Sequence, residues 1–146
     1  MLGPSSGVMP GTALTDSSVI DGVMELPMTV FTDGRSQLRH VQLTACSWAE
    51  MESLLWQALR HGQRSFVILS HNFELLNVQK NRPDKLVVSR FRKLCSFLEQ
   101  HSKDFKLCRM AAGPTRSEGP QPKPLRSGRL HTAWRMGEQA WRRSYG

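Results

Sequence analysis

The chain has 146 residues, a formal net charge of +8 and an isoelectric point near 10.1. Apolar residues make up 39% of it and the mean hydropathy is −0.40, which fits a protein with one ordinary domain. Most of them lie between Leu26 and Leu107, where we expect the core. No stretch approaches the ~20 consecutive apolar residues that a membrane-spanning helix requires.

The basic charge is concentrated at the C-terminal end. Residues 109–146 carry eight of the 20 Lys and Arg residues but only Glu118 and Glu138 of the 12 acids. Basic composition without hydrophobic periodicity favours disorder over a shaped nucleic-acid site. The sequence therefore predicts loop or disorder over residues 1–22, a folded domain over 23–108 and a basic, disordered tail over 109–146, and it makes nucleic acid an unfavoured partner.

The cysteines bear on the compartment. Cys46, Cys95 and Cys108 are odd in number and lack the spacing of a structural metal site, which is typical of proteins from a reducing compartment. The first 20 residues contain no basic segment followed by an apolar one, so no secretory signal is predicted. Together these features predict a cytoplasmic protein.

The first predicted elements are extended. Residues 24–31 have the β-branched and aromatic content of a short strand. Because Pro27 cannot donate a backbone hydrogen bond to a neighbouring strand, this segment is expected at the start of a strand or at a sheet edge. Residues 32–35 form a turn signal, and a second extended piece runs over 38–44. We expect a hairpin here, or a strand followed by a loop.

A helix is predicted to begin after Ser47. Ser47 and Glu50 match the S-x-x-E capping box, in which each side chain bonds the backbone of the other residue. Gly62 supplies the left-handed stop. The apolar stripe of this helix has a helical spacing and consists of Trp48, Met51, Leu54, Leu55, Ala58 and Leu59.

The remaining elements alternate in type. Residues 66–69 are apolar on both faces, as in a central strand covered by helices. Asp84 is a suitable N-cap for a second helix from about Leu86 to His101, and residues 103–107 suit a last edge strand. The order strand, helix, strand, helix, strand predicts an α/β layer with parallel strands.

His71 is the candidate catalytic residue because it follows the strand at 66–69 directly. Ligands and catalytic groups collect at the carboxyl ends of strands in α/β folds, and an imidazole titrates near neutral pH. Glu74 can orient His71 if residues 72–75 form a helical turn. The alternatives are a histidine that only caps the turn and a glutamate that faces solvent, because one titratable group is not a site.

The tail contains one further pattern. Trp134 and Trp141 lie seven residues apart, a helical spacing, with arginines beside them. A short amphipathic helix that binds RNA or an anionic membrane is one interpretation. The tail's composition favours disorder instead.

Four segments in order resemble a known family. They lie at residues 25–31, 43–47, 66–76 and 90–98, and together they resemble the C-terminal part of polysaccharide deacetylase-like proteins with NodB homology. The resemblance covers roughly residues 21–107. It implies the C-terminal part of a distorted (β/α) barrel, with alternating strands and helices, and disordered termini around it.

The resemblance also implies an activity. Such proteins remove acetyl groups from sugars: a divalent metal such as zinc, held by an aspartate and two histidines, activates water, and a late histidine protonates the leaving group. By the match of Ile68-x-x-His71, that general acid is His71. The aspartate pair and H-x-x-x-H motif have no counterpart here, so the metal ligands would lie upstream.

We therefore expect a C-terminal fragment or truncated relative of a deacetylase, inactive alone, with acetylated polysaccharide as its partner once completed. The alternative is a small basic protein that binds RNA or an anionic membrane through its Arg/Trp tail.

Overall fold

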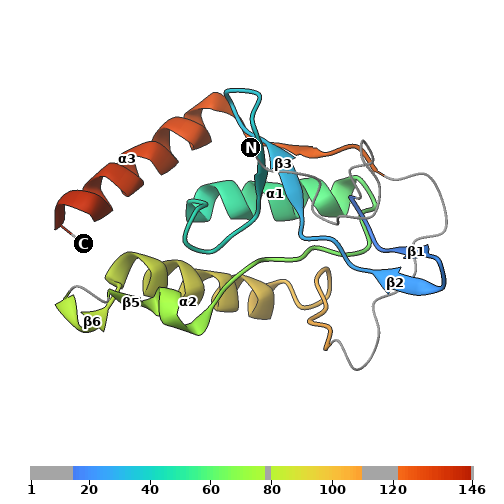
Figure 1. Cartoon of the computed structure of the whole chain (residues 1–146), viewed down its shortest axis with the longest axis horizontal. Helices are drawn as coiled ribbons and strands as arrows, with labels where there is room; N and C mark the ends of the chain where they lie inside the picture. The colour runs from blue at the N-terminus through green and yellow to red at the C-terminus, as the bar shows by residue number, and fades with distance from the viewer. Residues whose placement is uncertain (1–14, 78–79, 110–121, 146) are drawn as a thin grey trace.

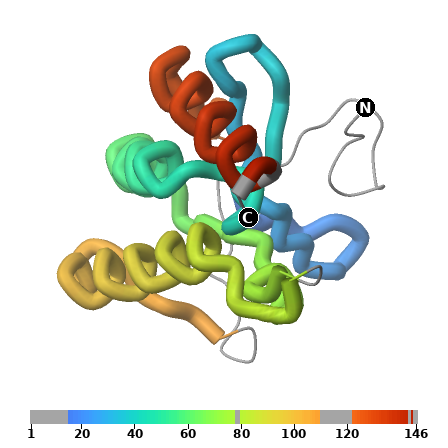
Figure 2. The backbone as a smooth tube through the Cα atoms, turned by 90° about the vertical axis from the view of Figure 1, so that its left-hand side faces the viewer, coloured from blue at the N-terminus to red at the C-terminus, as the bar shows by residue number. Residues whose placement is uncertain are grey.

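The computed structural model describes residues 15–77, 80–109 and 122–145. Figure 1 shows helix α1 (Trp48–Arg60) between two others, with α2 (Lys85–Gln100) on one side and α3 (Arg129–Tyr145) on the other. Figure 2, turned by 90°, shows the same order of the three helices. The central helix contacts both of its neighbours.

The described part of the chain begins with a small hairpin. Strands β1 (Ser18–Ile20) and β2 (Val23–Glu25) pair in antiparallel fashion around Asp21 and Gly22, whose φ angles are 50° and 80°. Positive φ at both central residues is what a type I′ turn requires, and Asp-Gly is a preferred pair for it. The prediction of loop or disorder over residues 1–22 is therefore wrong for residues 18–20, and residues 1–14 lie outside the described part.

The second hairpin corresponds to one of the two alternatives that the sequence allowed, but its strands are shorter than expected: the strand predicted over 24–31 is broken at 26–29, and only its last residues belong to the hairpin. Strands β3 (Val30–Thr32) and β4 (Leu38–His40) pair in antiparallel register, and strand β7 (Leu125–Arg126) adds to β3 in parallel. The strand order β4-β3-β7 places a segment from the predicted tail at the edge of this sheet. Residues 122–145 are thus part of the folded body.

The apolar run at 66–69 lies beside this hairpin. The backbone N–H of Leu69 donates to the carbonyl of Val41 at 2.9 Å, and that of Leu43 donates to Leu69 at 3.0 Å, in parallel orientation. The Val67 N–H, however, donates to the hydroxyl of Thr29 at 2.7 Å. Because a side chain replaces a backbone partner there, the run is extended and half-buried but forms a single bridge rather than the predicted central strand.

Helix α1 begins as predicted. The Ser47 hydroxyl accepts from the backbone N–H of Glu50 at 3.2 Å, and Gly62 follows the helix with φ at 66°. The Glu50 carboxylate, predicted to reach back to the Ser47 backbone, instead accepts from Ser127 and Arg135. Only half of the predicted capping box is therefore present.

The middle of the chain returns to a helix through short elements. A 3₁₀ turn, η1 (Asn72–Leu75), leads into strand β5 (Leu76–Asn77), which pairs with β6 (Arg82–Pro83). The Asp84 carboxylate then accepts from the backbone of the first turn of α2, so the predicted cap is confirmed. The edge strand predicted at 103–107 is wrong, because the chain leaves α2 through turns that hydrogen-bond to the His101 carbonyl.

The core lies between α1, the β3–β4 hairpin and α2. Its largest cluster of fully buried apolar side chains contains Phe31, Val41, Leu43, Cys46, Met51, Leu54, Ala58, Val87 and Leu125. Beside it, Phe97 packs edge-to-face against Trp48 and Trp56, with ring centroids 5.6 and 5.5 Å apart. Leu125 comes from the predicted tail, which therefore contributes to the core.

The predicted disorder of residues 109–146 is corrected for residues 122–145, which form β7 and α3; residues 110–121 lie outside the described part. Buried ion pairs rather than apolar contacts hold α3 down, so its inward face gives no hydrophobic period. The mixed α/β class is confirmed. The described strands form two- and three-stranded sheets and do not close into a barrel, so the partial distorted (β/α) barrel that the resemblance implies stays a prediction.

Candidate functional site

His71 stands at the edge where two parallel segments end. The pairing of Gln42 with Leu69 sets residues 41–43 beside the run 66–69, and both segments run in the same direction. The chain passes through Ser70 to His71 and then turns sharply into η1. The sequence placed His71 directly after a strand at 66–69, and the structure places it after an extended run that forms a single parallel bridge instead.

The turn η1 brings Glu74 back to His71, as the sequence predicted. A Glu74 oxygen lies 3.5 Å from Nδ1 of His71, and the other accepts from the His71 backbone N–H at 3.3 Å. The Gln42 side-chain amide donates to Glu74 at 2.7 Å from the neighbouring segment. Glu74 is therefore held from two sides, and it lies where it can orient the imidazole.

The imidazole itself is open to solvent. The His71 side chain is 48% exposed, against 13% for Glu74, and its ring stacks on Phe73 with centroids 5.0 Å apart. With Nδ1 toward the carboxylate, Nε2 is the ring nitrogen left to exchange a proton with a bound molecule. His71 is also the N-cap residue of η1, so the arrangement leaves both roles open that the sequence allowed: a proton-exchanging imidazole with an orienting carboxylate, and a histidine that only caps the turn.

The metal that the resemblance implies does not fit the residues present. Within the three described ranges, no group of three or more His, Cys, Asp or Glu side chains lies close enough to hold a metal ion. The pair of His71 and Glu74 supplies two such side chains.

The cysteines supply no nucleophile in the core. All three are free thiols, and Cys46 is buried while Cys95 and Cys108 are exposed. Burial raises the pKa of the Cys46 thiol to about 11, and the nearby Glu50 carboxylate acts in the same direction. Cys46 is therefore protonated at neutral pH and behaves as a small apolar core residue.

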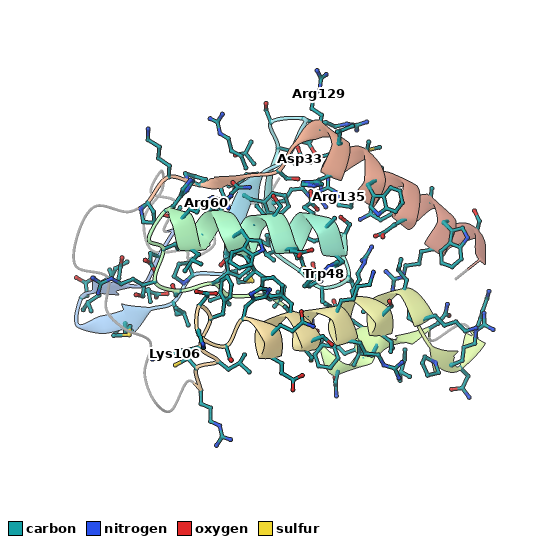
Figure 3. The ribbon with its side chains drawn as sticks, turned by 180° about the vertical axis from the view of Figure 1, so that it is seen from behind. Asp33, Trp48, Arg60, Lys106, Arg129 and Arg135 are labelled. Atoms are coloured by element: carbon teal, nitrogen blue, oxygen red, sulfur yellow. The ribbon has the colours of Figure 1, made fainter. Side chains whose placement is uncertain are left out.

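A buried charge cluster, which the sequence did not reveal, lies under α3. The Arg135 guanidinium donates to Asp33 at 2.9 Å and to both oxygens of Glu50 at 3.1 and 3.2 Å. All three side chains are at most 4% exposed, and Ser127 donates to Glu50 at 2.7 Å. Figure 3 shows Asp33 and Arg135 meeting between β3 and α3. One guanidinium thus serves two buried carboxylates, and the Ser127 hydroxyl gives Glu50 a further donor, so these contacts join β7 and α3 to the hairpin and α1.

Two further ion pairs fix α3 along its length. Arg90 of α2 is buried, donates to the carbonyls of Leu43 and Thr44, and pairs with Glu138 of α3. Arg142, near the end of α3, donates to Asp84 at 2.6 Å. The helix is thus attached to the hairpin, to α1 and to α2 by its charged side.

Of the sequence candidates, the structure brings His71 and Glu74 together and keeps Trp134 and Trp141 on one exposed side of α3. Sequence reasoning missed Gln42, because a single polar residue in an extended segment carries no signal of its partner. None of the described helices is both long and apolar enough to cross a membrane. Comparison of the chain with models of protein families, with curated proteins and with solved structures finds no match.

Proposed function

We propose that this chain is the C-terminal portion of a metal-dependent polysaccharide deacetylase and that His71 is its general acid, active only when an upstream half supplies the metal. The observation that supports this most is the His71–Glu74 pair at the shared end of two parallel segments. The resemblance of residues 25–31, 43–47, 66–76 and 90–98 adds to it. The distorted (β/α) barrel and the acetylated sugar substrate belong to the same proposal.

The chemistry assigned to this chain is one proton transfer. His71, oriented by Glu74, would donate a proton from Nε2 to the sugar oxygen or nitrogen as the bond between that atom and the acetyl carbonyl carbon breaks, which leaves the sugar hydroxyl or amine and acetate. Gln42 holds Glu74 by its amide and so fixes the ring indirectly. The exposure of the imidazole supports a role that needs an upstream half to cover it, since general acids act best where water is excluded.

We also propose that the protein works in the cytoplasm. The three cysteines of the chain are all free, and two of them are exposed, which supports a reducing compartment. The cellular fraction that contains the full-length gene product tests this directly. Recovery with periplasmic or secreted proteins would contradict it.

The test of the activity begins with the genomic sequence upstream of Met1. We expect an aspartate-pair motif and an H-x-x-x-H motif within ~150 residues, about one domain's length. The extended chain should then bind zinc by calorimetry and release acetate from acetylated chitin oligosaccharides. Absence of both motifs, or an extended chain that neither binds zinc nor releases acetate, removes the proposal.

Two variants of the extended chain assign the roles. His71→Gln should lower acetate release about 10²- to 10⁴-fold without weakening zinc binding, as expected for loss of a general acid. Lys93→Gln, at an exposed position on α2, is the matched control and should change neither. Equal losses in the two variants, or loss of zinc binding with His71→Gln, contradict the assignment.

A further inference from the structure

Helix α3 is amphipathic, but its polar side faces the protein and its apolar side faces solvent. Its charged and polar side chains face the protein: Thr132 and Arg135 are buried, and Gln139 donates to the carbonyl of Ala45 at 3.1 Å. The opposite side carries large apolar residues in the open. Leu130 is 86% exposed, Trp134 65% and Trp141 54%.

These outward residues form one strip. Leu130, Trp134, Gly137 and Trp141 follow each other at intervals of four, three and four residues, which keeps them on one side of the helix. They line a continuous shallow recess whose other lining residues are Ala133 and Glu138, and the Glu138 carboxylate is paired with Arg90. The Trp134 ring is held by a hydrogen bond from Nε1 to Glu138 at 3.0 Å. We call Leu130, Ala133, Trp134, Gly137 and Trp141 the α3 strip.

The charges around the α3 strip are predominantly basic. The acidic residues nearest to α3 already form ion pairs with Arg90, Arg135 and Arg142; they are Glu138, Asp33, Glu50 and Asp84. At the first turn of the helix, Arg129 points away from the body (Figure 3), and it lies against the turn that carries Arg35.

The far end of the strip is basic as well. Arg82 and Lys85 are exposed and line a second, smaller pocket, separate from the recess along α3, which Trp141 also borders. Within the described residues, none of these four basic side chains is in an ion pair. The apolar strip is therefore bounded by free positive charge at both ends.

We propose that the α3 strip binds the surface of an anionic lipid membrane, with the helix lying in the plane of that surface. The occupant is chosen by complementarity: negative headgroups meet the basic ends, and the interfacial region takes Leu130 and the two large indole rings, whose exposed apolar surfaces suit that depth. The helix of 17 residues lies flat rather than crossing, because its other side carries the buried ion pairs. This inference does not depend on the deacetylase proposal.

The experiment is co-sedimentation of the full chain with vesicles. Vesicles of equal parts phosphatidylserine and phosphatidylcholine should retain the protein, and pure phosphatidylcholine vesicles should retain little of it. Added salt should release it, since the attraction to headgroups is screened. Tryptophan emission should be quenched by lipids brominated on their acyl chains, which reports insertion of the rings rather than adsorption.

Variants separate the strip from the rest of the surface. Trp134→Gln combined with Trp141→Gln should weaken binding at least about tenfold, because two large apolar surfaces are removed. Phe73→Gln is the matched control: this ring is 60% exposed but lies on η1, and its loss should leave binding unchanged. Helical circular dichroism and the urea midpoint of each variant show that it remains folded.

A second pair of variants tests the charge. Arg35→Gln with Arg129→Gln should weaken binding and flatten its salt dependence, whereas Arg92→Gln with Lys93→Gln, at exposed positions on α2, should not. The proposal is overturned if vesicles do not retain the chain, if retention ignores lipid charge, or if controls and strip variants behave alike. Binding of poly-uridine in place of vesicles overturns it too. The proposal is also overturned if vesicles do not retain the chain and the chain instead forms a dimer that the tryptophan variants abolish.

Discussion

A single guanidinium, that of Arg135, holds two buried carboxylates that lie far apart in the sequence. Asp33 directly follows β3 and Glu50 lies in the first turn of α1, and both are buried. Transfer of a carboxylate into a protein interior is costly unless a cation and hydrogen bonds replace its water. Arg135 supplies the cation from the C-terminal helix, so the three segments depend on one side chain.

Replacement of Arg135 by Met should therefore destabilise the protein strongly. We expect a loss of about 3–5 kcal/mol in the free energy of unfolding, because Asp33 and Glu50 are left as uncompensated buried charges. Urea unfolding followed by circular dichroism measures it. Arg92→Met, at an exposed position on α2, is the matched control and should change stability by less than about 0.5 kcal/mol. A similar small effect of both variants contradicts the role of the cluster.

The same cluster predicts how stability depends on acid. Burial alone would raise the pKa of Asp33, but hydrogen bonds from Arg135 and from the backbone N–H groups of Arg35 and Gln37 outweigh it and hold the pKa below the ordinary value of 3.8. A depressed pKa stabilises the fold above the pKa of the unfolded chain, and that contribution is lost as the pH falls through the folded value.

The free energy of unfolding, measured from pH 6 downward, should therefore decrease as the solution becomes more acidic. Asp33→Asn should lower stability at neutral pH and make the acid slope shallower, since one titrating group contributes up to about 1.4 kcal/mol per pH unit. Lys93→Gln serves as the control and should keep the slope of the unaltered chain. An Asp33→Asn variant with an unchanged slope would show that other carboxylates cause the acid sensitivity.

At the scale of elements, the first turn of α3 is fitted against the β3–β4 turn. The Gly34 N–H donates to the Thr132 hydroxyl at 2.9 Å, and a Cβ added at Gly34 would stand 2.6 Å from the Cα of Arg129. The backbones approach too closely for any side chain. This contact sets where the helix starts relative to the sheet.

Gly34→Ala should accordingly displace α3. We expect a loss of about 1–3 kcal/mol, because backbone atoms rather than a flexible side chain must move. Gly137→Ala is the matched control, since a Cβ there meets nothing within 4 Å and alanine favours a helix interior by about 0.5–1 kcal/mol. Hydrogen exchange of the α3 amides should accelerate in the first variant alone. Equal exchange in both would contradict the fit.

The elements that sequence predicted correctly are those whose signals are local. Ser47 and Asp84 cap helices within three residues of themselves, and most of the apolar stripe of α1 packs inward as its period indicates, with only Leu59 exposed. Glu74 was placed beside His71 for the same reason, since the two lie within one turn. The Asp21-Gly22 hairpin carried a local signal too, but its strands have no strong apolar alternation.

Errors arose where partners lie far apart in the chain. Arg135 finds Asp33 at a separation of 102 residues, and no spacing rule connects them. The apolar period of α3 is real, yet it describes the exposed side, so it could not reveal the docked one. Gln42 reaches Glu74 only because a distant segment pairs beside it. Whether a polar residue is buried depends on such non-local partners, which single-sequence patterns do not contain.

At the scale of the whole molecule, residues 122–145 complete the fold. Leu125 is buried in the main core cluster, and β7 pairs with β3. Side chains of α3 form ion pairs with buried charged residues of the hairpin, α1 and α2. Without these residues Glu50, Asp33 and Arg90 would lose their charged partners together. The chain should therefore unfold as one cooperative unit that includes its C-terminal helix.

Two truncations test this dependence. A chain that ends at residue 121 should lack a cooperative urea transition, because the apolar area of Leu125 and three buried ion pairs are lost at once. A chain that ends after Arg142 keeps every one of those pairs and should retain its transition within about 1 kcal/mol, since helix ends fray at little cost. Cooperative unfolding of the shorter chain at an unchanged midpoint would show that residues 15–109 fold independently and that α3 is only an attachment. A broad, shifted transition in the shorter chain alone would establish that a basic, proline-containing end of the sequence is as much a part of this fold as its apolar centre.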